Sequence, residues 1–325
     1  MTENLNVSGL EEIFDPGVSR TRKTAVVKNV FNEKNYLNTR LNNGETTREI
    51  KIRILLTKDN DGRNKMAIPV LFHNMKLTDK QQQSKVISKT SKFKSFVCLN
   101  DTHIHNEEGC PLCKKMTEIF KEANSYKEGG EHPNSEIYKS LCKEAYKYEP
   151  KTVYLVRCIE RGKEDEGVKF WRFNKHDDGN GIYDTLFYLY NQCKEEDGVN
   201  MFDYNEGFDI VIRLTGTSDK TTTSVSLSRK PSKLADTQEQ IDAWVNDGKN
   251  WQDMYRAKSY EYLDIVAEGE SPIWSNEENK FVKWVPVEEL KQREKDIEAE
   301  AIQELKSSVT ESVEEIVEDN NELPF

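Results

Sequence analysis

The residues with the clearest chemical potential are cysteines and histidines in one stretch of the chain. Cys110 and Cys113 form a Cys-x-x-Cys pair, and Cys98 lies upstream of them. Such a pair supplies two thiolates to one ion, and zinc favours four tetrahedral nitrogen and sulfur ligands. Cys98 is the natural third ligand, and one histidine completes a closed shell. The nearby histidines are His73, His103 and His105. The spacing therefore predicts one structural Zn²⁺ ion rather than a catalytic one.

Other chemistry at this cluster is less well supported. An ordinary or redox-active thiol pair would not need a third cysteine and three histidines nearby. Zinc deaminases combine His-x-Glu with Pro-Cys-x-x-Cys, but here His105 is only a few residues from Cys110, and Pro111 lies inside the pair. The sequence also has no phosphate-binding glycine loop, His-Glu-x-x-His helix or serine elbow. We therefore predict that the chain is not an enzyme.

A second signal is the interleaving of aromatic and basic residues. Single-strand binders need cations for phosphates and flat rings on which bases stack. Alternation along residues 169–175 puts Lys169, Trp171, Phe173 and Lys175 on one face, which predicts an exposed tryptophan between lysines. The alternative is that the rings face the core. The full set expected to contact nucleic acid is Tyr148, Lys151, Tyr154, Lys169, Trp171, Arg172, Phe173 and Lys175.

Short strands around helical insertions must position these residues. The patterns predict hairpins over residues 48–72, 153–173 and 208–227, and helices over residues 114–126, 135–148 and 238–258. This order indicates a mainly β protein with helical additions (α+β), built on a small barrel. A last helix is expected to begin at Pro286.

Charge is distributed unevenly along the 325 residues. Residues 288–325 carry 13 acidic and four basic side chains, so −9 of the net charge of −11 lies there. Residues 1–287 are nearly neutral, which is compatible with a nucleic-acid partner. The acidic residues at the end of the sequence are expected to form a solvated tail. No window reaches about 18 consecutive apolar residues, and the start lacks a signal-peptide pattern. We therefore expect a protein of a reducing cytoplasm with no membrane partner.

The order of these features resembles a known family. A basic arm, a strand carrying His73, the Cys110-Pro111-Leu112-Cys113 knuckle, the strand of residues 166–173 and an acidic tail are similar to the replicative single-stranded-DNA-binding protein of T-even tailed bacteriophages. The resemblance covers residues 48–230 in pattern. It implies an oligonucleotide-binding barrel with an inserted zinc subdomain at about residues 70–150.

The resemblance also implies roles for single residues. The zinc ligands would be His73, Cys98, Cys110 and Cys113, although longer gaps than the family's leave His103 or His105 as possible fourth ligands. Trp171 falls where the family has a DNA-facing aromatic residue. The motif Arg22-Lys23-Thr24 resembles the family's cooperativity motif, and the tip Leu323-Pro324-Phe325 resembles a partner-binding ending of bacterial single-strand-binding proteins.

The function implied is sequence-independent coating of single-stranded DNA in phage replication, recombination and repair. Partner proteins would bind the acidic tail, copies would self-associate along DNA, and the protein would act in the cytoplasm of the infected host. The expected organisation is an arm (1–45), a core (46–285) and a helix with the tail (286–325). The alternatives are a zinc-knuckle scaffold that binds only proteins, and a metal-dependent nuclease using Asp177, Asp178 and Asp184.

Overall fold

The computed structural model describes residues 35–59, 61–104, 106–129, 135–176, 178–217 and 220–286, together with residues 289, 295 and 302. Three predicted features lie outside the described residues: the arm motif Arg22-Lys23-Thr24, the tip Leu323-Pro324-Phe325, and His105. The described part is a mixed α+β fold around an antiparallel sheet of seven strands.

The strands pair in the order β5-β4-β6-β1-β8-β9. Strand β7 pairs with the edge of β6 opposite the one that pairs with β4 and β1. Because β6 pairs with β4 along its first half and with β1 along its second, it is the central strand. The strands are β1 (Thr47–Leu55), β4 (Ile68–Lys76), β5 (Phe93–Val97), β6 (Pro150–Glu160), β7 (Lys169–Asn174), β8 (Ile210–Gly216) and β9 (Thr221–Leu227).

Apolar side chains are buried on both faces of the sheet. One face packs Tyr154 and Trp171 against α4 (Ile182–Gln192) and residues of β1 and β8. The opposite face packs Leu155 and Phe170 against Trp251 of α6 (Trp251–Met254). Neighbouring residues of β6 and β7 therefore belong to different core layers, as the period of two in a strand requires.

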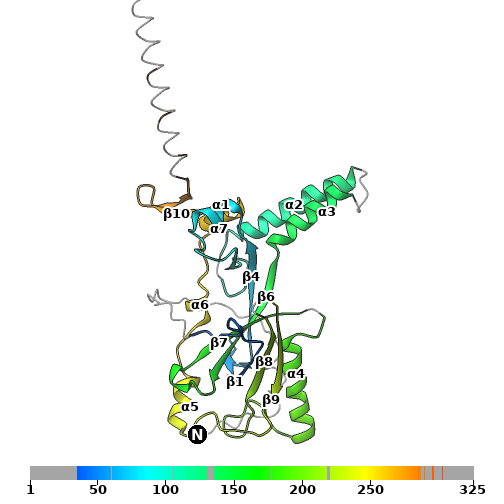
Figure 1. The fold of residues 1–325 in the computed structure, drawn as a ribbon, viewed down its shortest axis with the longest axis vertical. Helices are drawn as coiled ribbons and strands as arrows, with labels where there is room; N and C mark the ends of the chain where they lie inside the picture. The colour runs from blue at the N-terminus through cyan, green and yellow to red at the C-terminus, as the bar shows by residue number, and fades with distance from the viewer. Residues whose placement is uncertain are drawn as a thin grey trace, which may run out of the picture. The chain divides into compact units, whose positions relative to one another are not determined.

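A helical hairpin extends from the ends of β4 and β6. It consists of α2 (Pro111–Glu128) and α3 (Glu136–Ala145), and a short 3₁₀ turn (η4, Tyr146–Tyr148) leads from α3 into β6. Figure 1 shows β4 and β6 running side by side toward these helices. The two helices predicted for this region are thereby confirmed.

The remaining described elements are shorter. Strands β2 (Thr57–Lys58) and β3 (Asn64–Lys65) form a small hairpin, and η5 (Glu164–Glu166) and η6 (Cys193–Asp197) are single turns. The predicted helix over residues 238–258 is divided into α5 (Gln238–Val245) and α6, and α7 (Tyr260–Ala267) follows. The chain forms two compact units, of which the first comprises Met1–Lys76 and Phe93–Ala267.

The second unit comprises Leu77–Lys92 and Glu268–Phe325. Its described elements are α1 (Asp79–Ser84) and a hairpin of β10 (Pro272–Ser275) and β11 (Lys280–Lys283). A capping box at Thr78 begins α1, and Thr78 also donates a hydrogen bond to the carbonyl of Gly269, which ties the two segments of the unit together.

Two topological predictions differ from the structure. The hairpins over residues 153–173 and 208–227 are confirmed, but β1 and β4 do not pair with each other, because each pairs with a different half of β6. The strand pairings among the described residues also leave the sheet open rather than closing it into a barrel. Within the same residues, no helix has the length and apolar character needed to cross a membrane.

Candidate metal centre and sheet face

Strands β4 and β5 position the first two ligands of the predicted metal site. His73 of β4 lies opposite Phe96 of β5, and Cys98 follows two residues later, so His73 and Cys98 project from the same side of the strand pair. The backbone N–H of Cys98 donates to the carbonyl of Leu71 (2.9 Å), which extends the pairing to the cysteine itself. Both His73 and Cys98 have 0% exposure.

The start of α2 positions the other two ligands. Cys110 is the residue before the helix, Pro111 occupies its first turn, and Cys113 lies one turn along. Proline suits this position because its fixed φ is helical and its missing N–H would have no partner there. The positive end of the helix dipole also favours thiolates at this position. The Cys-x-x-Cys spacing therefore becomes one helical turn that directs both sulfurs toward His73.

The four ligand atoms form one compact cluster. They all lie within 4.8 Å of one another. The Sγ atoms of Cys98 and Cys113 are 3.5 Å apart, and Nε2 of His73 lies 3.4 Å from Sγ of Cys110 and 3.7 Å from Sγ of Cys113. Tetrahedral bonds of zinc-like length would give about 3.8 Å between sulfurs and about 3.6 Å between sulfur and nitrogen. The donor set therefore fits one closed-shell metal ion, and the sulfur separation excludes a disulfide.

The electrostatics of the cluster also call for a cation. Hydrogen bonds from Cys113 and Cys98, together with His73, lower the pKa of Cys110 far below its ordinary value. The hydrogen bond with Cys110 is the main reason why the pKa of Cys98 is raised, and the same contact raises the pKa of Cys113 to about 11. Three thiolates this close together repel one another, and a bound cation would offset that repulsion.

The outer hydrogen bonds decide which histidine can be a ligand. Nδ1 of His73 lies 2.7 Å from the carbonyl oxygen of Tyr148, so this nitrogen carries the proton and Nε2 directs a lone pair into the cluster. Nδ1 of His103 instead lies 2.6 Å from the carboxylate of buried Asp101, and its ring packs edge-on against Trp251. The structure thus places His73 with the cysteines and excludes His103 from the cluster.

The predicted exposure of the aromatic residues on β7 is wrong. Trp171 is 1% exposed and Phe173 is 7% exposed, with their ring centroids 4.6 Å apart. Tyr154 of β6 is also buried, and its ring stacks on that of Tyr183 at 4.2 Å. These rings belong to the core layer beneath α4. The alternative interpretation, in which the rings face the core, is therefore the correct one.

Lys169 does not reach the surface either. It is 2% exposed and forms ion pairs with Glu160 and Glu166. Burial by itself lowers the pKa of Lys169, but the hydrogen bonds with these two carboxylates raise it above its ordinary value. Lys169 is thus a satisfied buried cation, and its charge is not offered to a phosphate.

The opposite face of the same strands carries two exposed lysines, Lys76 and Lys151. The strand register places Phe93 beside Lys76, Ser95 beside Asn74, and Lys151 beside Phe72. Arg172 lies beside Leu155, and Asn174 lies beside Val153. We call the exposed end of this surface the basic sheet face, which consists of Asn74, Lys76, Phe93, Ser95, Lys151, Arg172 and Asn174. No strand position of β4–β7 on this side carries a carboxylate.

Arg172 is held at the centre of the basic sheet face by neutral groups. Its guanidinium carbon lies 4.4 Å from the ring centroid of Phe72 and 5.4 Å from that of Tyr255. Its Nη2 donates to Oδ1 of Asn74 (3.4 Å) and to Oγ of Ser95 (3.3 Å). These contacts fix the orientation of the guanidinium without neutralising its charge. Arg172 therefore keeps its affinity for an anionic ligand.

The remaining predicted nucleic-acid residues have mixed surroundings. Lys151 and Lys175 are exposed, whereas Tyr148 is partly buried with its hydroxyl 3.5 Å from the carbonyl of Ala267. Sequence reasoning did not identify Tyr255, which covers the guanidinium of Arg172 and packs edge-on against Phe72. Tyr255 lies more than 80 residues from Arg172 in the sequence, so no local pattern connects the two.

The described acids of the nuclease alternative have local structural roles. Asp178 accepts a hydrogen bond from the backbone of Asn180 within a turn. Asp184 accepts a hydrogen bond from the backbone N–H of Gly181 (3.1 Å) and so caps the start of α4. Asp177 lies outside the described residues. These contacts account for both described carboxylates without a divalent ion.

Comparison with known proteins gives no further guidance to function. No protein-family model matches the sequence, and no curated protein matches it either.

Proposed function

We propose that the protein binds single-stranded nucleic acid, single-stranded DNA in the first place, through the basic sheet face, without base sequence preference and without chemical turnover. The observation that carries the proposal is the combination of three cations with an exposed ring on one carboxylate-free sheet surface. Lys76 and Lys151 are exposed, Arg172 is held by neutral partners, and Phe93 is 63% exposed.

Each part of this surface has a role in the proposed binding. Lysine and arginine side chains neutralise phosphates, and an exposed ring offers a platform on which any base can stack. Asn74 and Asn174 add uncharged donors and acceptors between the cations. Phosphate contacts and stacking on a ring carry no base-sequence information, which supports binding without sequence preference.

The metal centre supports the same surface from behind. His73 lies between Phe72 and Asn74 in β4, so the strand that supplies a metal ligand on one side supplies two contacts of Arg172 on the other. We identify the ion as Zn²⁺, because a Cys3His donor set is typical of structural zinc. When bound, zinc supplies only cross-linking of the two strands to α2.

The resemblance to the T-even phage family extends the proposal. It assigns the open sheet to an oligonucleotide-binding fold, and the protein to phage replication, recombination and repair in the infected host. In the same proposal the arm of residues 1–45 mediates self-association along DNA, and the acidic tail recruits replication and recombination proteins.

A titration of fluorescein-labelled oligo-dT, followed by fluorescence anisotropy at several salt concentrations, tests the proposal. Arg172→Ala and Lys151→Ala should each weaken binding and make the log–log salt slope shallower by about 0.7. Phe93→Ala should cost about 1–3 kcal/mol of binding free energy through lost stacking. Lys220→Ala is the matched control, because Lys220 is exposed in the β8–β9 turn, at the far edge of the sheet.

The scaffold alternative makes a different prediction for the same experiment. A protein that binds only proteins would leave the anisotropy of oligo-dT unchanged at every salt concentration. Equal losses in Arg172→Ala and Lys220→Ala would also contradict the proposal, because binding would then follow total charge rather than the basic sheet face.

A further inference from the structure

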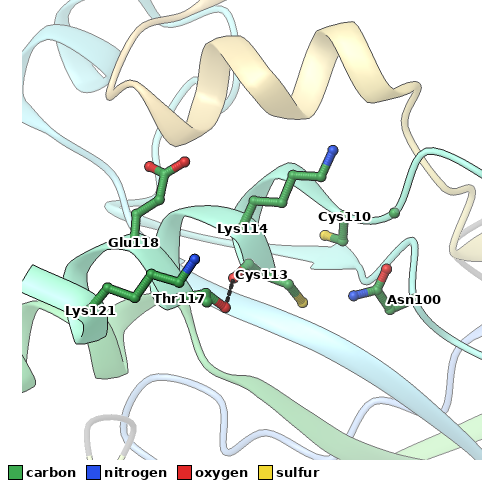
Figure 2. A pocket seen from close by; sticks show the side chains of 8 residues that line it. Asn100, Cys110, Cys113, Lys114, Thr117, Glu118 and Lys121 are labelled. Atoms are coloured by element: carbon green, nitrogen blue, oxygen red, sulfur yellow. Dashed lines mark hydrogen bonds between the residues drawn. The ribbon is translucent and has the colours of Figure 1, made fainter.

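The metal centre is not equally sealed on all sides. His73 and Cys98 have 0% exposure and Cys110 has 1%, whereas Cys113 is partly exposed. A pocket of about 340 Å³ opens at this point, with Cys110 and Cys113 in its wall. Figure 2 shows the side chains that line the pocket, which come from the first three turns of α2 and from Asn100. A small molecule can therefore approach the cluster from one direction, and Cys113 is the ligand it meets there.

The α2 side chains that line the pocket favour anionic molecules. Lys114, Thr117, Glu118 and Lys121 lie on one face of α2, because their spacings are three, four and seven residues. Two cations and one carboxylate give this face of α2 a net positive charge. Lys114 is held in place by a hydrogen bond from its Nζ to the hydroxyl of Tyr260 (3.2 Å).

Hydrogen bonds also order the pocket wall around Cys113. The hydroxyl of Thr117 donates to the carbonyl of Cys113 (3.0 Å), as the dashed line in Figure 2 shows. The side chain of Asn100 hydrogen-bonds with the sulfur of Cys113. Of these two contacts, the one from Asn100 holds the sulfur itself.

We propose that Cys113 is a modification site for small anionic disulfides and is the ligand through which the metal is lost. The Cys113 thiolate attacks one sulfur of the disulfide, a new sulfur–sulfur bond forms, and the original one breaks. The second half of the reagent leaves as a thiolate, so Cys113 is oxidised and the reagent is reduced. The Cys113 sulfur loses its negative charge and its capacity to bind the metal strongly, which leaves three protein ligands. This inference goes beyond the proposed function and does not depend on nucleic-acid binding.

The test uses the full-length chain loaded with one equivalent of zinc, in a Cys142→Ser background that removes the other partly exposed thiol. The dianionic reagent is 5,5′-dithiobis(2-nitrobenzoate), and the neutral reagent is 2,2′-dithiodipyridine. Peptide mass spectrometry locates the first adduct, and a chromogenic chelator follows zinc release. We expect the first adduct at Cys113, with zinc release at the same rate.

Charge variants test the role of the pocket. Lys121→Glu should slow the dianionic reagent about threefold more than the neutral one, because it reverses a nearby charge that salt screens only partly. Lys139→Glu, the same change on exposed α3, should leave the ratio of the two rates unchanged. A first adduct at Cys98 or Cys110 would overturn the proposal, as would equal effects of Lys121→Glu and Lys139→Glu. Zinc release before any adduct at Cys113 would overturn it as well.

Discussion

Replacing Trp171 by Phe should lower stability while leaving nucleic-acid binding intact. The indole is 1% exposed and contacts Phe173 in the core layer beneath α4, so the smaller ring leaves a cavity there. Loss of part of a buried ring costs about 2 kcal/mol of unfolding free energy when transfer and cavity contributions are combined. For a domain of this size, that loss corresponds to a decrease in Tm of about 4–8 °C.

The neighbouring residue provides the matched control. Arg172 lies on the opposite face of β7, so Arg172→Ala should weaken oligo-dT binding and change Tm much less than Trp171→Phe does. Differential scanning calorimetry gives Tm, and anisotropy at 20 °C gives the dissociation constant for both variants. A Trp171→Phe protein with an unchanged Tm and much weaker binding would show that the indole contacts DNA, and it would refute our placement of the nucleic-acid surface.

Three further predictions follow from the described contacts and the sequence. Zinc removal by a strong chelator should unfold the region around residues 98–113 and lower Tm, because structural zinc contributes about 10–16 kcal/mol to folding. Atomic emission should find no bound metal in His73→Ala and one equivalent in His103→Ala. Burial alone raises the pKa of Glu160, but its hydrogen bonds with Lys163 and Lys169 lower it overall. The resulting stabilisation is present above about pH 4 and is lost as pH falls through the lowered pKa of Glu160. In urea titrations, Lys169→Met should therefore lower the unfolding free energy strongly at pH 7 and less at pH 2. An equal loss at both pH values would contradict the ion pair. Removal of residues 307–325 should tighten oligo-dT binding at low salt, and an unchanged affinity would argue against competition by the acidic tail.

Local patterns predicted the metal cluster well. Cys110 and Cys113 need only one helical turn to share an ion, and such spacing can be recognised without knowledge of the fold. The choice among the histidines needed the structure, because His73 reaches the cysteines through the pairing of β4 with β5, and His103 is occupied by Asp101. A sequence records neither strand register nor a competing buried carboxylate.

Alternation along β7 was predicted correctly, but its orientation was not. Trp171 and Phe173 do share a face, and Arg172 lies on the other. Alternation with a period of two does not show which face of a strand is exposed when both faces pack into a core. In β7, Phe170 packs into one core layer and Trp171 into the other. The lysines around Trp171 suggested an exposed face, but Lys169 is buried and pairs with two carboxylates that precede it in the sequence.

The barrel was expected from repeated short strands, yet these strands pair in an open order. Strand patterns predict that a sheet forms and which segments belong to it. The pairing of β4 and β1 with successive halves of β6 is a long-range arrangement, which short-range alternation does not encode.

The most direct test of the central claim is photo-cross-linking of the full chain to oligo-dT that contains 5-iodouracil, with the adducts located by peptide mass spectrometry. Binding on the basic sheet face predicts adducts at Phe93 and on neighbouring peptides of β4–β7, and their loss in Arg172→Ala at a concentration where the unmodified chain is saturated. Adducts at Trp171 or on the β8–β9 hairpin, with none at the basic sheet face, would contradict the account.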